Sequence, residues 1–304
     1  MVLNRQRILI IGAGPAGISA AIQLRRYGLE LVLLEKEKIG GLLRNANWVE
    51  NYPGFPNGVV GPKLIGLMEK QLKRIGVQVR HEEVRELDWD REKFLIETYD
   101  GKYAADVVIV ATGTKSRDAP NVISDHARGK VFTEVWPLLK EQEKHIVIVG
   151  AGDAAFDYAL NLSKKRNSVT ILNRGESVQC LGLLWERASL EPAISYRAGV
   201  ALRWIDVDKT ADRLRLALSA VEGVECEADG LPEEVIADFV IFAIGRDPQL
   251  DFLSENLKRC EKELVETGKL YFVGDVHNGL LRQTAIAVGE GLRAAMQIHS
   301  KLEK

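Results

Sequence analysis

The stretch from Arg7 to Glu35 constrains the fold of this chain more than any other. It begins with an apolar, β-branched run, passes through three glycines (Gly12, Gly14 and Gly17) into a helical pattern, and ends in a second apolar run. This order of strand, glycine turn, helix and strand predicts a βαβ unit. In such a unit the first glycine makes the tight turn, the second lets the backbone approach a pyrophosphate, and the third lets the helix pack closely on the strand. We therefore expect a dinucleotide site here.

Glu35 closes the second strand of this unit. A carboxylate there accepts hydrogen bonds from an adenosine ribose, and it favours a free 2′-hydroxyl over a 2′-phosphate. The helix N-terminus presents its first N–H groups to the phosphates. Two further glycines, Gly40 and Gly41, let the backbone pass close to a ligand, so we expect the following loop on the cofactor side.

The opening pattern returns at His145, with Gly150 and Gly152 in the turn and a second strand that ends at Asn173. From position 12 to 35 and from 150 to 173 the interval is the same 23 residues. Asn173 therefore stands where Glu35 stands in the first unit. The chain contains two dinucleotide motifs.

The residue after Asn173 is the cationic Arg174. A neutral side chain followed by an arginine favours a 2′-phosphate, and hence NADP over NAD. A solvated surface charge is the alternative for Arg174.

Size and composition limit the function classes. A length of 304 residues allows about two domains. With 41 basic and 43 acidic side chains, the chain has no strong field to recruit nucleic acid or an anionic membrane. The three cysteines, Cys180, Cys226 and Cys260, form no C-x-x-C and no zinc-like spacing, so we expect free thiols, no metal site and a cytoplasmic protein. The apolar N-terminal segment is interrupted by glycines and followed by Arg25 and Arg26, unlike a signal peptide.

The rest of the chain alternates between helical and strand patterns. In the first half we expect a surface helix at 62–76, a three-stranded β-meander at 77–103, a buried parallel strand at 105–113 and a short helix at 133–140. In the second half we expect a second meander at 201–218, a closing strand at 237–245, a C-terminal strand at 270–275 and a C-terminal helix at 284–302. The segment 180–196 is poorly patterned.

These elements predict an α/β fold with two Rossmann-like dinucleotide-binding domains, three-layered (ββα), each with a β-meander. The first domain is expected to be discontinuous, at 1–113 and 245–304. The second is expected at 114–244. A C-terminal strand and helix that return to the first domain explain why the chain continues past Gly245.

Two dinucleotide domains with meanders resemble the low-molecular-weight thioredoxin reductase branch of the FAD/NAD(P)-linked disulfide reductases, over nearly the whole chain. The most specific matches are the runs at 49–54, 111–113, 274–276 and 281–285. The resemblance implies FAD in the first domain, NADPH in the second, and a homodimer. It also implies that Asn51 lies on the flavin side, that Asp275 binds the ribitol, and that the helix beginning near Gln283 stabilises negative charge on the reduced flavin.

Motifs and resemblance together give the expected cofactor-binding residues. In the first domain these are Gly12, Gly14, Pro15, Ala16, Gly17, Glu35, Lys36, Gly41, Leu42, Leu43, Asn51, Thr112, Gly113, Gly274, Asp275, Arg282, Gln283 and Thr284. In the second they are Gly150, Gly152, Asp153, Ala154, Asn173, Arg174 and Gly245. No catalytic side chain is expected, because the flavin carries the chemistry. His277 is interpreted as a surface-turn histidine, with a place near the flavin as the alternative.

One departure from the family changes the expected reaction. Thioredoxin reductases carry a redox-active C-x-x-C before the strand that enters the second glycine motif, and the matching window here is Thr133–Trp136, without cysteine. Two related enzyme types, the ferredoxin–NADP reductases and the bacillithiol disulfide reductases, also lack that dithiol. The first type carries a further C-terminal segment, and the second has a cysteine where this chain has Ala16, so neither type fits this chain fully. Trp136 is interpreted either as an aromatic lid on the flavin or as ordinary core packing.

We therefore expect an NADPH-dependent FAD oxidoreductase that passes electrons to an unknown external acceptor, either a small molecule or a redox protein. Alternatives are a ferredoxin- or flavodoxin-NADP reductase-like enzyme, a flavin monooxygenase, and a non-catalytic FAD-binding redox sensor.

Overall fold

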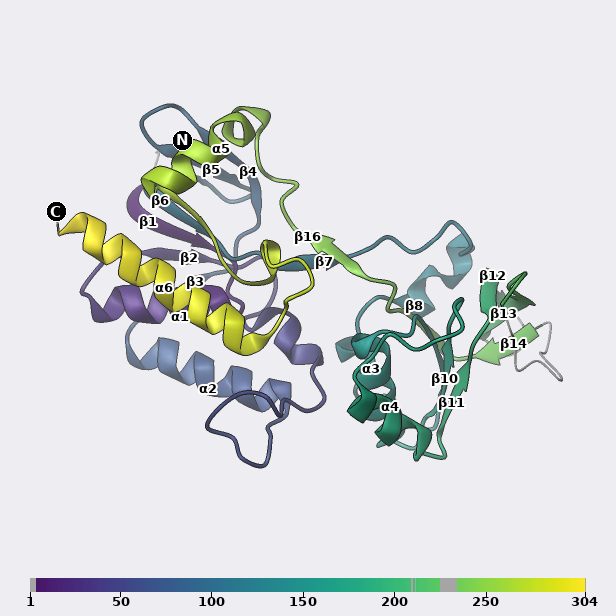
Figure 1. Cartoon of the computed structure of the whole chain (residues 1–304). Helices are drawn as coiled ribbons and strands as arrows, with labels where there is room; N and C mark the ends of the chain where they lie inside the picture. The colour runs from purple at the N-terminus through teal and green to yellow at the C-terminus, as the bar shows by residue number, and fades with distance from the viewer. Residues whose placement is uncertain (1–3, 209, 211, 225–233, 304) are drawn as a thin grey trace. The chain divides into compact units, whose positions relative to one another are not determined.

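The computed structural model describes residues 4–208, 210, 212–224 and 234–303, with side chains from residue 8 onward. Cys226 lies outside the described residues. The chain forms two compact units. Unit 1 takes in the chain up to Arg44, Trp48–Lys115 and the chain from Asp247 on, and unit 2 consists of Asn45–Asn47 and Ser116–Arg246. Each unit is described by itself below (Figure 1).

Unit 1 is built on a parallel sheet. Five strands pair in the order β3-β2-β1-β6-β17. They are β1 (Asn4–Ile11), β2 (Val32–Leu34), β3 (Val79–Arg80), β6 (Lys102–Val110) and β17 (Leu270–Phe272). β1, β2 and β6 read as continuous apolar runs because a parallel sheet is covered on both faces. The predicted return of a C-terminal strand is confirmed, since β17 pairs with β6 in parallel.

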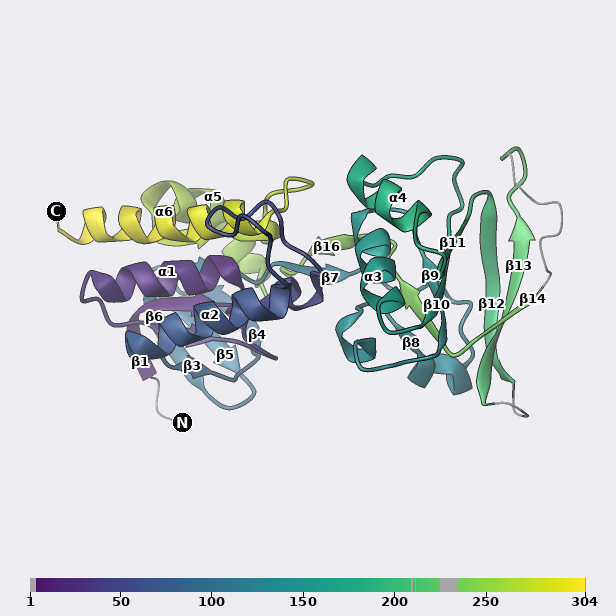
Figure 2. The same cartoon turned by 90° about the horizontal axis from the view of Figure 1, so that it is seen from below.

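Three helices cover one face of this sheet: α1 (Pro15–Arg26), α2 (Gly61–Arg74) and α6 (Thr284–Leu302) (Figure 2). The closest contact is between α1 and α6. A Cβ on Gly291 of α6 would lie 2.0 Å from the carbonyl oxygen of Ala16, so only glycine permits this approach. The predicted C-terminal helix is confirmed and lies against the first glycine motif.

The first meander differs from the prediction. Val79–Arg80, expected as its first strand, instead pairs in parallel with β2. The meander consists of β4 (Val84–Trp89), β5 (Phe94–Thr98) and the start of β6. β6 is a continuous nine-residue strand whose first half pairs with β5 and whose second half extends the parallel sheet. A two-residue strand carries too little alternation to reveal its partner.

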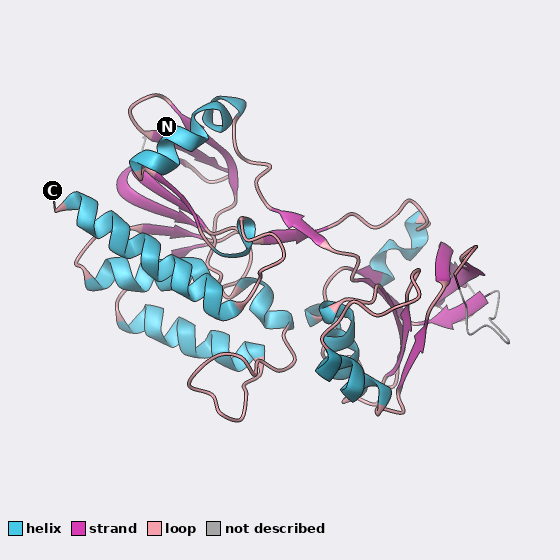
Figure 3. Ribbon diagram, in the orientation of Figure 1, coloured by secondary structure: helices cyan, strands magenta, loops and turns pink. Residues whose placement is uncertain are grey.

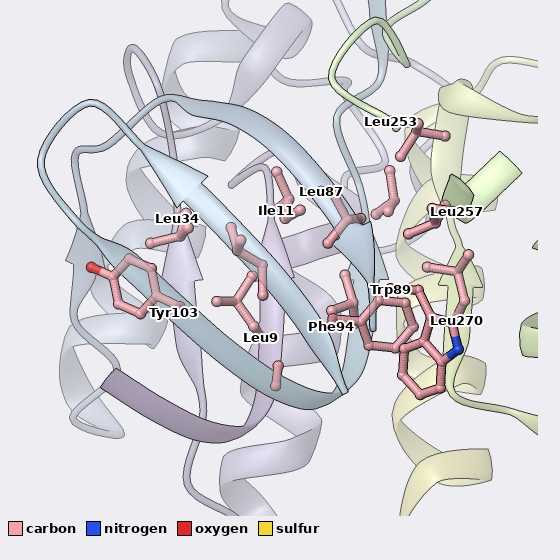
Figure 4. Packing of buried hydrophobic residues seen from close by; sticks show 14 of the residues in the cluster. Leu9, Ile11, Leu34, Leu87, Trp89, Phe94, Tyr103, Leu253, Leu257 and Leu270 are labelled. Atoms are coloured by element: carbon pink, nitrogen blue, oxygen red, sulfur yellow. The ribbon is translucent and has the colours of Figure 1, made fainter. Parts of the chain in front are cut away.

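The other face of the sheet packs against the meander and α5 (Glu255–Thr267) in one hydrophobic core (Figure 4). Phe94, Leu87 and Leu257 are fully buried there. The sequence reasoning missed α5. Its signals are present, since the Ser254 hydroxyl caps the helix by accepting the Leu257 N–H at 3.0 Å, and Gly268 ends it in the left-handed conformation.

Unit 2 holds a second parallel sheet, whose strands are magenta in Figure 3. The strand order is β11-β10-β9-β15-β8. Its strands are β8 (Val131–Phe132), β9 (His145–Val149), β10 (Ser168–Leu172), β11 (Ile194–Arg197) and β15 (Phe239–Phe242). Helices α3 (Asp153–Ser163) and α4 (Gly182–Ser189) pack on one face. α4 and β11 account for the segment 180–196, which the sequence left without an assignment.

The other face of that sheet packs against the second meander, which is confirmed as a three-stranded antiparallel sheet of β12 (Val200–Asp208), β13 (Arg213–Ala220) and β14 (Glu234–Ala237). The predicted helix at 133–140 is shorter than expected: only the 3₁₀ turn η3 (Trp136–Leu138) forms. Pro137 has no N–H to donate, and it is tolerated only in a first helical turn. The described segments also contain the 3₁₀ turn η2 (Asp125–Lys130) and the short strands β7 (Thr114–Ser116) and β16 (Arg246–Pro248), which pair together.

Within the described part of the chain, no helix is long and apolar enough to cross a membrane.

Candidate functional site

The first glycine turn joins the ends of three strands. Gly12 follows β1 with a φ of 102°, and a Cβ there would lie 2.4 Å from the carbonyl oxygen of Ala111, which follows β6. The Gly12 N–H donates to the carbonyl of Leu34 at the end of β2, at 2.8 Å. Both the positive φ and the close approach require glycine. The turn is thus fixed at the C-terminal edge of the parallel sheet, where such sheets bind ligands.

Open space lies beyond this turn at Gly14. Gly14 is the N-cap of α1, and a Cβ on it would meet nothing within 4 Å. Pro15 occupies the first turn of the helix, and the first α-helical bond runs from the Ile18 N–H to Gly14. A Cβ on Gly17, in contrast, would lie 1.9 Å from the carbonyl oxygen of Gly12. Gly14 therefore borders open space at a helix N-terminus, whereas Gly17 serves helix–strand packing.

Glu35 is buried directly after β2 and is oriented by backbone groups. One carboxylate oxygen accepts the Ala13 N–H at 2.8 Å and the other accepts the Glu37 N–H at 2.9 Å. Each carboxylate oxygen has a second lone pair, so this orientation leaves acceptors for ribose hydroxyls. Lys36 is exposed, with its Nζ 3.9 Å from Glu37.

The loop with two glycines returns to the same turn. The Gly40 N–H donates to the Ala13 carbonyl at 2.8 Å, and a Cβ on Gly41 would lie 3.5 Å from the Gly14 Cα. Gly41 begins the 3₁₀ turn η1 (Gly41–Asn45), which includes Leu42 and Leu43. The structure thus brings this predicted loop to the first glycine turn.

Gly274 and Asp275 form the 3₁₀ turn η4 (Gly274–Val276) beside the start of α1. Gly274 has a φ of 78°, and a Cβ on it would lie 3.0 Å from the Ala16 Cβ. The two predicted parts of the site, far apart in sequence, are therefore neighbours. His277 is exposed, with its Nε2 4.0 Å from Glu290, as the surface-turn interpretation expects.

Glu290 of α6 is a site residue that the sequence reasoning missed. Its carboxylate accepts the Gly274 N–H at 2.6 Å and the Asn278 side-chain amide at 2.9 Å, and so holds the turn around Asp275. The available signal was a single acid between two glycines in the apolar first half of the helix.

Asn51 and Gln283 are joined by a hydrogen bond of 2.7 Å between their side-chain amides. Gln283 is the N-cap of α6, with Arg282 before it and Thr284 as the first helical residue. This bond links two runs that carried the family resemblance. At the end of β6, the Thr112 hydroxyl donates to the Gln249 carbonyl at 2.8 Å, and the Gln249 N–H donates to the Gly113 carbonyl at 3.1 Å.

The glycine turn of unit 2 repeats the first one. Gly150 has a φ of 127°, and a Cβ there would lie 2.3 Å from the carbonyl oxygen of Ala243. Its N–H donates to the Leu172 carbonyl at the end of β10, at 2.9 Å. Gly152 is the N-cap of α3, and the Asp153 carboxylate accepts the Leu181 N–H at 2.7 Å. Ala154, next in the helix, is exposed.

Asn173 and Arg174 follow β10 as the spacing predicts. Arg174 is exposed. The Asn173 amide donates to the Ser177 carbonyl at 3.0 Å and to the Tyr196 hydroxyl at 2.8 Å, so its hydrogen bonds lie within the protein. Gly245 follows by two residues Ala243, whose carbonyl oxygen faces Gly150, and its own carbonyl accepts the Arg117 N–H at 3.1 Å.

The window Thr133–Trp136 forms a polar cluster. Glu134 pairs with Arg246 at 3.0 Å and accepts a hydrogen bond from the Asn45 side chain. The Trp136 N–H donates to the Asn45 Oδ1 at 3.2 Å. The window that sequence counting matched to the family's dithiol therefore contributes a carboxylate, Glu134, that pairs with the guanidinium of Arg246.

Asp157 of α3 lies beside this cluster and accepts the Asn47 N–H at 2.9 Å. Burial raises its pKa to about 6, although the Asn47 hydrogen bond and the charge of Lys164 oppose that rise. Lys164 donates to the Asn47 Oδ1 at 2.7 Å. These bonds explain why Asn45–Asn47 belongs to unit 2.

The described thiols are not arranged for relay. Cys180 lies in unit 2 and Cys260 in unit 1, and both are free and half-buried. Burial, and after it the charge of Asp153, raises the pKa of the Cys180 thiol. A raised pKa disfavours the thiolate that disulfide chemistry needs.

Comparison with known proteins places this geometry in context. Residues 6–291 match the family model described as pyridine nucleotide-disulphide oxidoreductase. A thioredoxin reductase of Streptomyces coelicolor is 31% identical, with 96% of this chain and 92% of that protein covered. A 34.2 kDa protein in the rubredoxin operon of Clostridium pasteurianum is 30% identical, with 95% and 94% covered. The crystal structure of T. acidophilum thioredoxin reductase superimposes with a TM-score of 0.82 at 26% identity, over 99% of this chain and 100% of that one.

Proposed function

This chain belongs to the pyridine nucleotide-disulphide oxidoreductase family, and on that premise we propose that it passes electrons from NADPH through FAD to an external acceptor without a dithiol of its own. Membership confirms the coarser predictions: the thioredoxin reductase resemblance, the α/β fold with two dinucleotide domains, and a flavin-dependent oxidoreductase. Enzymes of the thioredoxin reductase type use FAD and NADPH, which confirms the cofactor prediction.

The observation that carries the proposal is the contrast between complete nucleotide turns and a sequence without a C-x-x-C. Both turns retain the glycines that phosphate binding needs, whereas the window at 133–136 offers Glu134 where a thiol would be required. When bound, the flavin supplies hydride acceptance and electron transfer, and the chain's residues orient it.

We propose that FAD lies along unit 1, from Glu35 at the adenosine end to Asp275 and Gln283 at the flavin end. The support is that Ala16 contacts the Gly274 turn and that Asn51 bonds Gln283. Glu35→Arg is expected to weaken FAD retention, because it removes the ribose acceptor and the buried carboxylate that two backbone N–H groups face. Retention of FAD at the parent level would contradict the ribose assignment.

We propose NADPH rather than NADH as the donor, because the exposed Arg174 stands beside the adenosine end of the second turn. Arg174→Ala is expected to raise the KM for NADPH and leave that for NADH unchanged. Equal losses with both coenzymes, or a parent protein that prefers NADH, would contradict this assignment.

We also propose that the protein is cytoplasmic and that the second domain begins after residue 113 and ends at residue 244. We further propose that the protein is a homodimer. On α6 the side chains of Ile286, Leu292 and Met296 are exposed, and an apolar surface of this kind is often covered by another chain. Light scattering at several concentrations tests the dimer, with Met296→Glu as the disrupting variant. A monomeric parent protein would contradict it.

The test of the function is anaerobic mixing with NADPH, followed by an acceptor. Flavin absorbance should bleach with NADPH, and it should recover on addition of a one-electron acceptor but not of a protein disulfide. The acceptor panel includes ferredoxin, a quinone, oxygen and rubredoxin, the last because one relative is described as a protein in a rubredoxin operon. A flavin that stays oxidised under NADPH would contradict the proposal and favour a redox sensor.

A further inference from the structure

The loop after β10 carries Arg174, the charged residue that the proposed function assigns to coenzyme choice. Its neighbours fix the loop at both ends. The Asn173 N–H donates to the Arg197 carbonyl at 2.9 Å, and the Gln179 N–H donates to the Ala151 carbonyl in the glycine turn at 2.8 Å. The loop therefore runs from the end of the sheet back to the second glycine turn, across the edge where the adenosine would lie.

Inside the loop, the Asn173 side chain makes three hydrogen bonds. Its Oδ1 accepts the Gly175 N–H at 3.0 Å, and its Nδ2 donates to the Ser177 carbonyl at 3.0 Å and to the Tyr196 hydroxyl at 2.8 Å. An amide has two hydrogens to donate, so both are engaged. Asn173 thus shapes the loop rather than presenting free donors to a ribose.

Tyr196 anchors this arrangement to the core. It lies on β11, opposite Ile171 of β10, and its ring packs 5.1 Å from the ring of Trp185 and 6.0 Å from that of Phe156. Phe156 is fully buried and belongs to α3, the helix that begins at the glycine turn. The tyrosine hydroxyl therefore has little freedom to move, and it holds Asn173 in one orientation.

We propose that Tyr196, acting through Asn173, is a positioning residue that presets the loop carrying Arg174 for a coenzyme 2′-phosphate. The inference rests on the proposed preference for NADPH. A loop that is ordered before binding does not lose that conformational freedom when the phosphate arrives, so its order increases affinity for the phosphorylated nucleotide. Nucleotides without the 2′-phosphate make no contact with Arg174 and should gain little.

The test measures binding of 2′,5′-ADP and 5′-AMP by calorimetry, which requires neither flavin reduction nor an acceptor. The parent protein should prefer 2′,5′-ADP. Tyr196→Phe keeps the ring packing and removes the hydroxyl, and it should weaken 2′,5′-ADP binding by about fivefold, the factor expected for one net hydrogen bond, while 5′-AMP binding changes less than about twofold. Asn173→Ala removes all three bonds and should weaken 2′,5′-ADP binding further.

Tyr103→Phe is the matched control. The Tyr103 hydroxyl in unit 1 donates to Glu82 at 2.6 Å and accepts from Arg80 at 3.0 Å, so this variant also loses a hydrogen-bonded phenol. It should leave both dissociation constants unchanged. A double-mutant cycle then tests the route: in an Arg174→Ala background, Tyr196→Phe should no longer affect 2′,5′-ADP binding.

Three results would overturn the inference: no preference for 2′,5′-ADP in the parent, an unchanged ratio in folded Tyr196→Phe and Asn173→Ala proteins, or full additivity with Arg174→Ala. A parent protein that binds 2′,5′-ADP selectively but leaves its flavin oxidised under NADPH would contradict the proposed function and leave this inference intact.

Discussion

The glycine turns of the two units have nearly the same geometry, but the residue at the third glycine position of the motif differs between them. Cβ atoms on Gly12 and Gly150 would lie 2.4 and 2.3 Å from carbonyl oxygens of the neighbouring strand ends. In unit 1 the third position is Gly17, where a Cβ would lie 1.9 Å from a carbonyl, whereas in unit 2 it is Ala155, whose methyl group is fully buried. The first helix therefore approaches its strand more closely than the second.

The comparison extends to the residue that ends the second strand. Glu35 is held by two backbone N–H groups that act on its carboxylate, whereas Asn173 is held by the loop and by Tyr196. The shared part of the motif fixes a phosphate turn. We propose that the divergent parts, an acid in one unit and an amide followed by arginine in the other, favour different nucleotides.

The largest effect is expected from a substitution at the third glycine of the motif in unit 1. Gly17→Ala places a methyl group against the Gly12 carbonyl, a backbone contact that cannot relax without moving the turn, and should destabilise unit 1 by about 3 kcal/mol or more. The purified variant should have a lower Tm and contain little FAD.

The matched change in unit 2 is Ala155→Gly, which should cost only about 1 kcal/mol through helix propensity and a lost methyl contact. The FAD content of that variant should equal the parent's. If Gly17→Ala keeps its FAD and its Tm, the difference in packing between the units is not real.

The next effect concerns α6, which packs on α1 in unit 1. Gly291→Ala would place a Cβ 2.0 Å from the Ala16 carbonyl and force the helices apart, at a cost of about 2 kcal/mol. Thermal unfolding measures this. Gly289→Ala on the same helix is the control, because a Cβ there meets nothing within 4 Å, and it should raise stability by up to about 1 kcal/mol. Equal effects of the two substitutions would contradict the close contact.

A third effect is specific to unit 2 and depends on pH. Burial raises the pKa of Asp157 from 3.8 to about 6, so its ionisation opposes folding. That penalty is absent below pH 3.8, grows as the pH rises through this window, and is complete above about pH 6. Asp157→Asn should therefore stabilise the protein by about 3 kcal/mol at pH 8 and by only about 0.5 kcal/mol at pH 4.

Urea unfolding at the two pH values measures this difference, with the exposed Asp118→Asn as the matched control. A stabilisation by Asp157→Asn that does not depend on pH would show that the buried charge is not its cause.

Local patterns predicted the parts of the fold that local geometry determines. The glycine spacing located both turns, and apolar runs located β1, β6 and β17, because a buried parallel strand needs such a run. Val79–Arg80 was assigned to the meander, whereas it pairs in parallel with β2, because two residues carry no usable periodicity.

The roles of Glu290, Asn47 and Tyr196 depend on partners that no local pattern reveals. Glu290 bonds the Gly274 turn 16 residues away, and Lys164 bonds Asn47 across 117 residues. Such pairs are set by the packing of whole elements, so a single sequence does not indicate them. Asn51 and Gln283 were found only through the family resemblance. Their 2.7 Å hydrogen bond supports the placement of the runs at 49–54 and 281–285 in one site.

The central claim is that two nucleotide units in one chain transfer electrons without a thiol. The most direct measurement compares the parent with a variant in which Cys180, Cys226 and Cys260 are all serine, using stopped-flow mixing with NADPH and a one-electron dye. Flavin reduction and dye turnover should equal the parent's, with no disulfide turnover in either protein. Disulfide turnover that is present in the parent and lost in the variant would contradict the claim.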